Sequence, residues 1–226
     1  MPVFRDDALP EGYLLLRGLL SPLERLALGG QLEDVTAGAA GERDCLDRPW
    51  CQALARWLLA HPVLQGYLPC DPVAVQCTLF EKSADCNWLV TPHQDLAIPV
   101  AERIEHEAMH AWSVKGGRHF VLAPAELLSQ LLAVRLHVDD AAVADGGLRF
   151  VPRSHLDGVL DDADVPRWKA AGEVAVDARA GDALLMRPLV LHASSKATNA
   201  SGRRRVLHFL FGPARLPFGV RWHVAA

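Results

Sequence analysis

Three side chains in this sequence could form a metal centre: His93, Asp95 and a distant histidine, His192. His93 and Asp95 are two residues apart, so on an extended segment their side chains point to the same face. Two imidazoles and one carboxylate suit a non-haem Fe(II) centre, because three ligands on one face leave the opposite face open for oxygen and a co-substrate. Arg204 is a permanent cation that can bind a carboxylate through two hydrogen bonds. These residues are the minimal set for a 2-oxoglutarate-dependent oxygenase.

The H-x-D pattern alone is close to a chance event in a chain with ten histidines. The flanking sequence is more specific, with three segments in this order: FEKSADCNWLVTPHQDLAIPV, LAVRLHVDDAAVADGGLRFVPRSH and ALLMRPLVLHASSKATNASGRRRVLHFLF. Together they resemble the phytanoyl-CoA dioxygenase family of iron and 2-oxoglutarate oxygenases, from about Gly12 to about Pro213. The resemblance implies an enzyme that uses Fe(II), 2-oxoglutarate and O2 to oxidise a C–H bond, chiefly by hydroxylation, and that releases succinate and CO2.

The resemblance also implies roles for single residues. The three residues of the predicted metal centre match the family's iron ligands. Arg204 matches the arginine that anchors 2-oxoglutarate, because it is the first of a basic pair before an aliphatic pair. Arg203 is the alternative, since this loop is one residue longer than usual. Ser194 matches a hydroxyl group that helps to hold the same carboxylate.

Two further positions are candidates for ligand contact. Arg135 stands where family members often have tryptophan, and it could contact 2-oxoglutarate or an acidic substrate, or point outward into a salt bridge. One face of a predicted strand carries four alternating residues: Gln76, Thr78, Phe80 and Lys82. If this face lines the barrel interior, Gln76 and Lys82 need polar partners there. Contact with the substrate or co-substrate is then expected for Gln76.

A competing motif occurs at His106–His110, which reads HEAMH. On a helix this H-E-x-x-H pattern would place two imidazoles on one face for zinc, with Glu107 as the base. The extension typical of metzincins does not follow, and the segment is short. We therefore expect an exposed helix at 101–110. A zinc metallopeptidase remains one alternative function, and a non-catalytic jelly-roll binding module is the other.

Helices come first in the chain and strands later. A strand is predicted at 12–18, a helix from the capping box Ser21–Glu24 to about Val35, and another helix at 48–60. A short helix is predicted at 126–132. The later predicted strands are 73–82, 90–98, 132–138, 147–151, 173–177, 183–186, 189–193 and 204–211. This order predicts a mainly β fold with flanking α-helices, namely a double-stranded β-helix (jelly roll, cupin-like).

We expect one oxygenase domain over residues 1–226. Within it, 1–70 would supply an N-terminal strand and helices, 71–215 the jelly-roll core, and 216–226 a C-terminal tail. The net charge of −4 and the pI of about 6.2 give no case for nucleic acid or an anionic membrane as partner. Five cysteines without a C-x-x-C pattern, and the lack of a long apolar run, fit a cytoplasmic protein. The expected partner is a polar small-molecule substrate, such as an amino-acid or natural-product intermediate.

Overall fold

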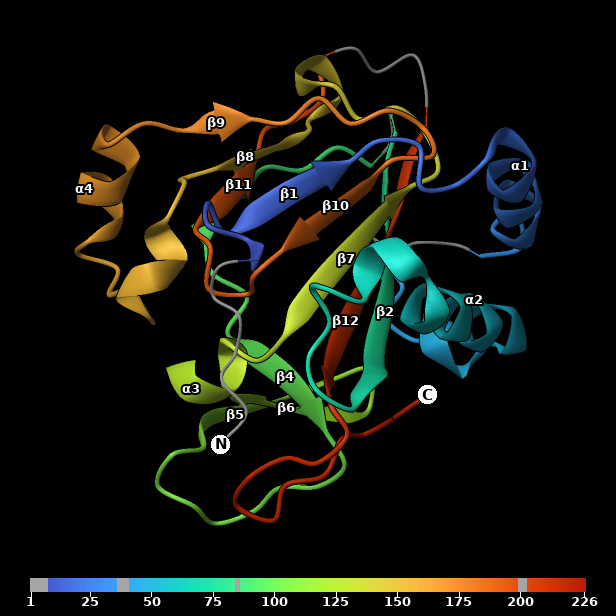
Figure 1. Ribbon diagram of the computed structural model, residues 1–226. Coiled ribbons are helices and arrows are strands. Elements are labelled where there is room, and N and C mark those ends of the chain that lie inside the picture. Colours follow the sequence, from blue (N-terminus) through green and yellow to red (C-terminus); the bar gives the residue numbers. More distant parts are fainter. Residues whose placement is uncertain (1–7, 36–40, 84–85, 199–202) are drawn as a thin grey trace.

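The computed structural model describes residues 8–35, 41–83, 86–198 and 203–226 (Figure 1). Its strands form three antiparallel sheets. The five-stranded sheet has the order β1 (Tyr13–Leu16), β10 (Ala183–Met186), β7 (Leu132–His137), β12 (Arg204–Pro213) and β2 (Pro72–Lys82). The four-stranded sheet has the order β3 (Val90–His93), β11 (His192–Ser194), β8 (Leu148–Phe150) and β9 (Val174–Ala175). The three-stranded sheet has the order β4 (Ala97–Val100), β6 (Arg118–Leu122) and β5 (His110–Lys115). This confirms the predicted jelly-roll class.

Helices flank the strands, and the two longest lie beside the five-stranded sheet (Figure 1). The helices are α1 (Pro22–Gln31), α2 (Pro49–Ala60), α3 (Ala125–Leu128) and α4 (Val165–Ala170). The predicted capping box starts α1: Ser21 Oγ accepts from Glu24 N, and Glu24 Oε2 accepts from Ser21 N at 2.8 Å. In the described part of the chain, no helix has the length and apolar run that a membrane crossing requires.

The two faces of the five-stranded sheet face different layers of core. On the outer face, Leu207 and Phe209 of β12 belong to one cluster of buried residues with Ala55 and Leu58 of α2. The opposite face belongs to a second cluster, which includes Phe150 of the four-stranded sheet. Strand alternation makes this division, since successive side chains point to opposite faces. The second face borders the pocket described below.

The predicted helix at 101–110 is wrong. Val100 forms a β-bridge with Trp222, and Ala101 N donates to Arg221 O at 2.9 Å. The chain beyond β4 is therefore held by the C-terminal segment, and it runs without helix to β5, which begins at His110. His106 stacks on the Phe218 ring at 4.2 Å. His106 and His110 thus share no helix face, and the H-E-x-x-H motif lacks its zinc-binding geometry.

Other differences concern the extent of elements. The predicted strand 90–98 is two strands in different sheets, β3 and β4, and between them the Asp95 N–H donates to Pro188 O at 2.9 Å. The predicted helix 126–132 is the single turn α3. The β5–β6 hairpin and α4 were not predicted.

Candidate metal centre and its pocket

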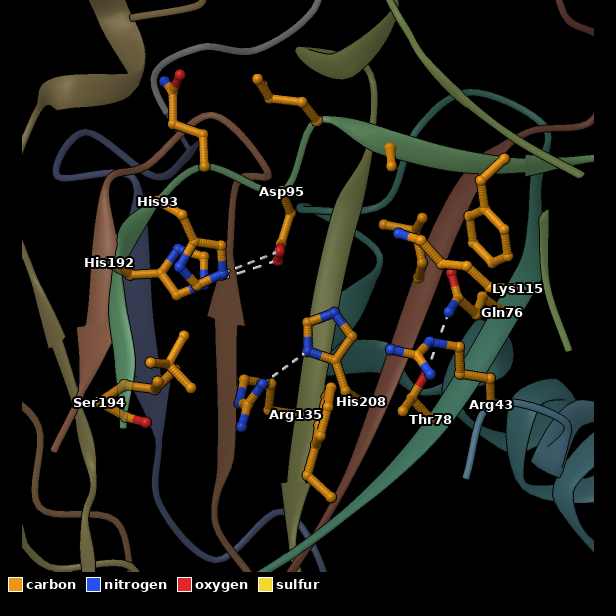
Figure 2. A pocket seen from close by; sticks show the side chains of 18 of the residues that line it. Arg43, Gln76, Thr78, His93, Asp95, Lys115, Arg135, His192, Ser194 and His208 are labelled. Atoms are coloured by element: carbon orange, nitrogen blue, oxygen red, sulfur yellow. Dashed lines mark hydrogen bonds and ion pairs between the residues drawn. The ribbon is translucent and has the colours of Figure 1, made fainter. Parts of the chain in front are cut away.

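His93, Asp95 and His192 lie together beside the ends of β3 and β11 (Figure 2). His93 and His192 are cross-strand partners, and their ring centroids are 4.3 Å apart. Asp95 Oδ1 lies 3.5 Å from His93 Nε2, and Asp95 Oδ2 lies 3.8 Å from His192 Nε2. One ligand atom from each residue lies within 4.8 Å of the other two. Within the described residues, this is the only cluster of at least three His, Cys, Asp or Glu side chains that meets this criterion.

Backbone carbonyls orient both imidazole rings. His93 Nδ1 lies 2.9 Å from Thr91 O, and His192 Nδ1 lies 3.0 Å from Val190 O. A carbonyl oxygen can only accept, so a neutral ring in either position carries its proton on Nδ1. The lone pair of each Nε2 is then directed to the side of Asp95. Metal-binding histidines usually have such a partner on the other ring nitrogen.

The charges of Asp95 and His192 suit a cation, whereas at His93 burial is outweighed by the hydrogen bond and the charge of Asp95, which raise the pKa of that ring. Burial opposes ionisation of Asp95, but the imidazoles of His192 and His93 hold the pKa of this carboxyl well below its usual range. Burial lowers the pKa of His192 to about 4 despite the nearby Asp95. At neutral pH the centre therefore offers a carboxylate and a neutral His192 ring, which are the protonation states that a metal ion requires.

The metal centre borders a cavity of about 450 Å³. One wall is β2, whose Gln76, Thr78, Phe80 and Lys82 all line the cavity, as their alternation predicted. Gln76 Nε2 donates to Thr78 Oγ1 at 3.1 Å. The inward face of β2 thus brings polar side chains into the pocket, and Gln76 has a polar partner within the strand.

Two buried cations form one end of the pocket. Lys82 and Arg204 are cross-strand partners on β2 and β12. Lys82 Nζ donates to Ser194 Oγ at 3.1 Å and to Ser195 O at 2.6 Å, whereas Arg204 Nη1 donates to Gly146 O at 2.7 Å. Arg204 Nε is buried and has no hydrogen-bond partner among the described residues. Burial, and then the charge of Arg204, lowers the pKa of Lys82 to about 8.

The two sequence neighbours of Arg204 form ion pairs with acidic side chains outside the pocket. Arg203 Nε donates to Glu81 Oε1 at 2.7 Å, and Arg205 Nε donates to Asp139 Oδ2 at 2.8 Å. Of the three arginines, only Arg204 lines the pocket, since strand alternation separates its side chain from both neighbours.

Arg135 points into the pocket, with 6% of the residue exposed, and not into a surface salt bridge. Its Nη1 lies 2.9 Å from His208 Nδ1 on the adjacent strand β12. A guanidinium can only donate, so His208 Nδ1 accepts and the ring proton is on Nε2. Burial and the charge of Arg135 lower the pKa of His208 to about 3, so the ring is neutral. The ring lies between Arg135 and Asp95 in Figure 2, and it presents an N–H donor to the pocket.

Sequence reasoning missed three ionisable residues that line the pocket: Arg43, Lys115 and His208. His208 had a usable signal, because it is four residues from Arg204 on one strand and so shares its face. Arg43 lies in a loop and Lys115 on the unpredicted β5–β6 hairpin, so no periodic pattern pointed to them.

A jelly roll that carries two histidines and one carboxylate in its pocket has the ligand set of non-haem Fe(II) oxygenases. Residues 10–206 match the family model of phytanoyl-CoA dioxygenase (PhyH). The chain therefore belongs to the phytanoyl-CoA dioxygenase family and is an oxygenase-type enzyme. No curated protein matches the sequence significantly.

Several solved structures share the fold. One is SnoK, described as a non-heme alpha ketoglutarate dependent carbocyclase from nogalamycin biosynthesis, with a TM-score of 0.65 and 20% identity over 91% of this chain and 81% of that chain. Another is HygX from Streptomyces hygroscopicus with nickel and 2-oxoglutarate bound, with a TM-score of 0.62 and 17% identity over 90% of this chain and 84% of that chain. At these identities the likeness establishes the fold.

Proposed function

We propose that this protein is an Fe(II)- and 2-oxoglutarate-dependent dioxygenase whose iron is held by His93, Asp95 and His192. The observation that carries the proposal is the convergence of two Nε2 atoms and one carboxylate at the edge of a pocket, with both rings oriented by backbone carbonyls. Three protein ligands leave further positions for a co-substrate and oxygen. The shared fold of HygX, which binds nickel and 2-oxoglutarate, supports this choice of metal class and co-substrate.

The basic end of the pocket fits 2-oxoglutarate. This co-substrate carries two negative charges, and neither Lys82 nor Arg204 has a carboxylate partner among the described ion pairs. A buried cation without a counter-ion is unfavourable, so an anionic ligand stabilises this end. We assign the far carboxylate of 2-oxoglutarate to Arg204 and Ser194, the predicted pair, and add Lys82, which hydrogen-bonds to Ser194.

The roles of the chain's residues follow from these positions. When bound, iron supplies the oxidising chemistry: with O2 it couples conversion of 2-oxoglutarate to succinate and CO2 with oxidation, chiefly hydroxylation, of a substrate C–H bond. Arg204 and Lys82 orient the co-substrate. Arg135 lies beside the centre, where its charge reaches either 2-oxoglutarate or an acidic substrate. Gln76 lies six positions from Lys82 along β2, so we assign it to the substrate side of the pocket.

The substrate proposed is a polar small molecule, such as a natural-product intermediate. The cavity has the size of small-molecule sites. SnoK belongs to nogalamycin biosynthesis, and HygX has been solved with hygromycin B bound. These relatives favour, as the substrate of this protein, a natural-product intermediate about as polar as those compounds and not a lipid.

Anaerobic addition of Fe(II) and then 2-oxoglutarate tests the function directly. The wild-type protein should develop the visible charge-transfer band of an iron-bound keto acid, and Asp95→Ala should not. His110→Ala is the matched control and should keep the band. Absence of the band from the wild type would contradict the proposal, and loss of metal in the His110 variant would favour zinc. A band without succinate formation on exposure to O2, across a broad panel of metabolites, would favour the non-catalytic binding module.

A further inference from the structure

The pocket is strongly basic although the chain is acidic overall. Its lining includes a single carboxylate, Asp95, and five cationic side chains: Arg43, Lys82, Lys115, Arg135 and Arg204. The net charge of the chain is −4. Positive charge is therefore concentrated where ligands bind, and this favours anions over neutral or cationic molecules.

The proposed cofactors do not neutralise this charge. Fe(II) and 2-oxoglutarate carry charges of equal size and opposite sign. The pocket with both bound therefore keeps the same excess of positive charge as the empty pocket. Among the described residues, none of the five cations forms an ion pair with an acidic side chain. Arg135 Nε, like Arg204 Nε, is buried without a hydrogen-bond partner there. This excess of positive charge favours a second anionic ligand beside 2-oxoglutarate.

The cations fall into two groups within the pocket. Lys82 and its partner Arg204 occupy one end of β2. Arg43 lies beside the middle of β2, because β-bridges join the residues on either side of it to Cys77 and Leu79. Lys115 is on the same side, away from Ser194 (Figure 2). Thr78, which lies between the two residues bridged to the neighbours of Arg43, is four residues from Lys82 on β2, and this corresponds to about 13 Å of extended strand. A five-carbon diacid is too short to engage both groups.

We propose that the substrate is an anionic small molecule whose carboxylate or phosphate is bound by Arg43 and Lys115. This inference rests on the proposed function, since the other end of the pocket is then occupied by 2-oxoglutarate. Arg43 is half-buried and makes no ion pair in the described structure, and the exposed Lys115 extends over the Phe120 ring at 5.1 Å. The metal ligands line the same pocket as these two cations, so an anchored substrate is held near the metal.

The test uses protein loaded with Mn(II) in place of iron, then saturated with 2-oxoglutarate. Binding of phenyl phosphate, benzyl alcohol and benzylamine is measured by calorimetry, because these probes share a ring and differ in charge. Phenyl phosphate should bind at least about tenfold more tightly than the other two. Arg43→Gln and Lys115→Gln should each weaken phenyl phosphate binding about tenfold and leave the affinity for 2-oxoglutarate unchanged. Arg56→Gln, at an exposed position of α2 outside the pocket, is the matched control.

The outcomes separate the two proposals. Failure of the wild-type protein to bind Mn(II) and 2-oxoglutarate would overturn the proposed function, and the inference with it. Normal loading combined with equal affinity for the three probes would overturn the inference alone. Displacement of phenyl phosphate by 2-oxoglutarate would show that phenyl phosphate binds at the metal or the co-substrate end. Undiminished phenyl phosphate binding in both variants would show the same. Either result would also overturn the inference.

Discussion

Arg135 and His208 face each other across β7 and β12, and the guanidinium donates a hydrogen bond to Nδ1 of the imidazole at 2.9 Å. The Phe80 ring lies against the same guanidinium, 5.4 Å from its carbon atom. A buried cation is thus paired with a neutral ring and an aromatic face, and its charge is left for a ligand. The pair also determines which nitrogen of His208 carries the proton.

Replacing Arg135 by Met should release this control over His208. In the wild type we expect the Nε2–H tautomer alone at neutral pH, visible in nitrogen–proton NMR correlations of the imidazole. In Arg135→Met both tautomers should appear, and the pKa of His208 should rise from about 3, because a nearby positive charge has been removed while burial remains. Arg203→Met, which removes a surface arginine, is the control. An unchanged spectrum in the Arg135 variant would contradict the assignment.

The three consecutive arginines should differ sharply in their effect on 2-oxoglutarate binding. Arg204→Met should weaken binding about ten- to a hundredfold, because one charge-assisted hydrogen bond contributes about 1.5–3 kcal/mol. Arg203→Met and Arg205→Met remove side chains that pair with Glu81 and Asp139, so the Kd should hardly change. Calorimetry with Mn(II)-loaded protein measures all three. Equal losses would mean that the run acts as a diffuse basic patch.

The affinity for 2-oxoglutarate should fall as pH rises through about 8. The pKa of Lys82 is lowered to about 8, chiefly by burial, so the free protein loses this charge above that pH. A bound dianion favours the protonated lysine, and binding is therefore tighter below pH 8 than above it. Lys82→Met should bind more weakly and lose this step in the pH profile between 7 and 9. A step of the same size in the variant would show that another group is responsible.

Gly146 should tolerate no side chain. Its φ is +72°, and a Cβ atom there would lie 2.6 Å from Ser195 O and 3.0 Å from Lys82 Nζ. Gly219 has nearly the same φ, +73°, with open space around it. Both alanine variants should lose about 1–2 kcal/mol of unfolding free energy from the backbone alone, and Gly146→Ala should lose more and also bind 2-oxoglutarate less well. Urea unfolding and calorimetry measure the two effects; equal losses in the two variants would contradict the close packing at Gly146.

Local sequence patterns predicted much of the framework of the site. The alternation of β2 put Lys82 on one face with Gln76, and this face lines the pocket; strand parity separated Arg204 from its two neighbours. Both predictions rest on the two-residue period of a strand, which holds whatever the tertiary structure. The cross-strand meeting of His93 with His192 was anticipated only through the family resemblance.

Features that depend on distant contacts could not be predicted. Residues 101–110 have helix-compatible sequence, but pairing of Val100 with Trp222 from the C-terminal segment decides their conformation. The β5–β6 hairpin, which carries Lys115, follows the predicted helix and was assigned to no strand. The contact of Arg135 with His208 was not predicted, because it depends on the register of β7 against β12.

The position of the two histidines has a consequence for the topology of the chain. His93 and His192 are 99 residues apart in sequence (192 − 93) and form one rung of the β3–β11 pair. A metal ion held by both would act as a cross-link that closes a very long loop at the edge of a short, three-to-four-residue strand pair. Loading with metal should therefore suppress local opening of these strands, and amide hydrogen exchange in β3 and β11 should slow more than in the distant helix α1. The metal ion would then also stabilise the structure, as a cross-link between the middle of the chain and its last quarter.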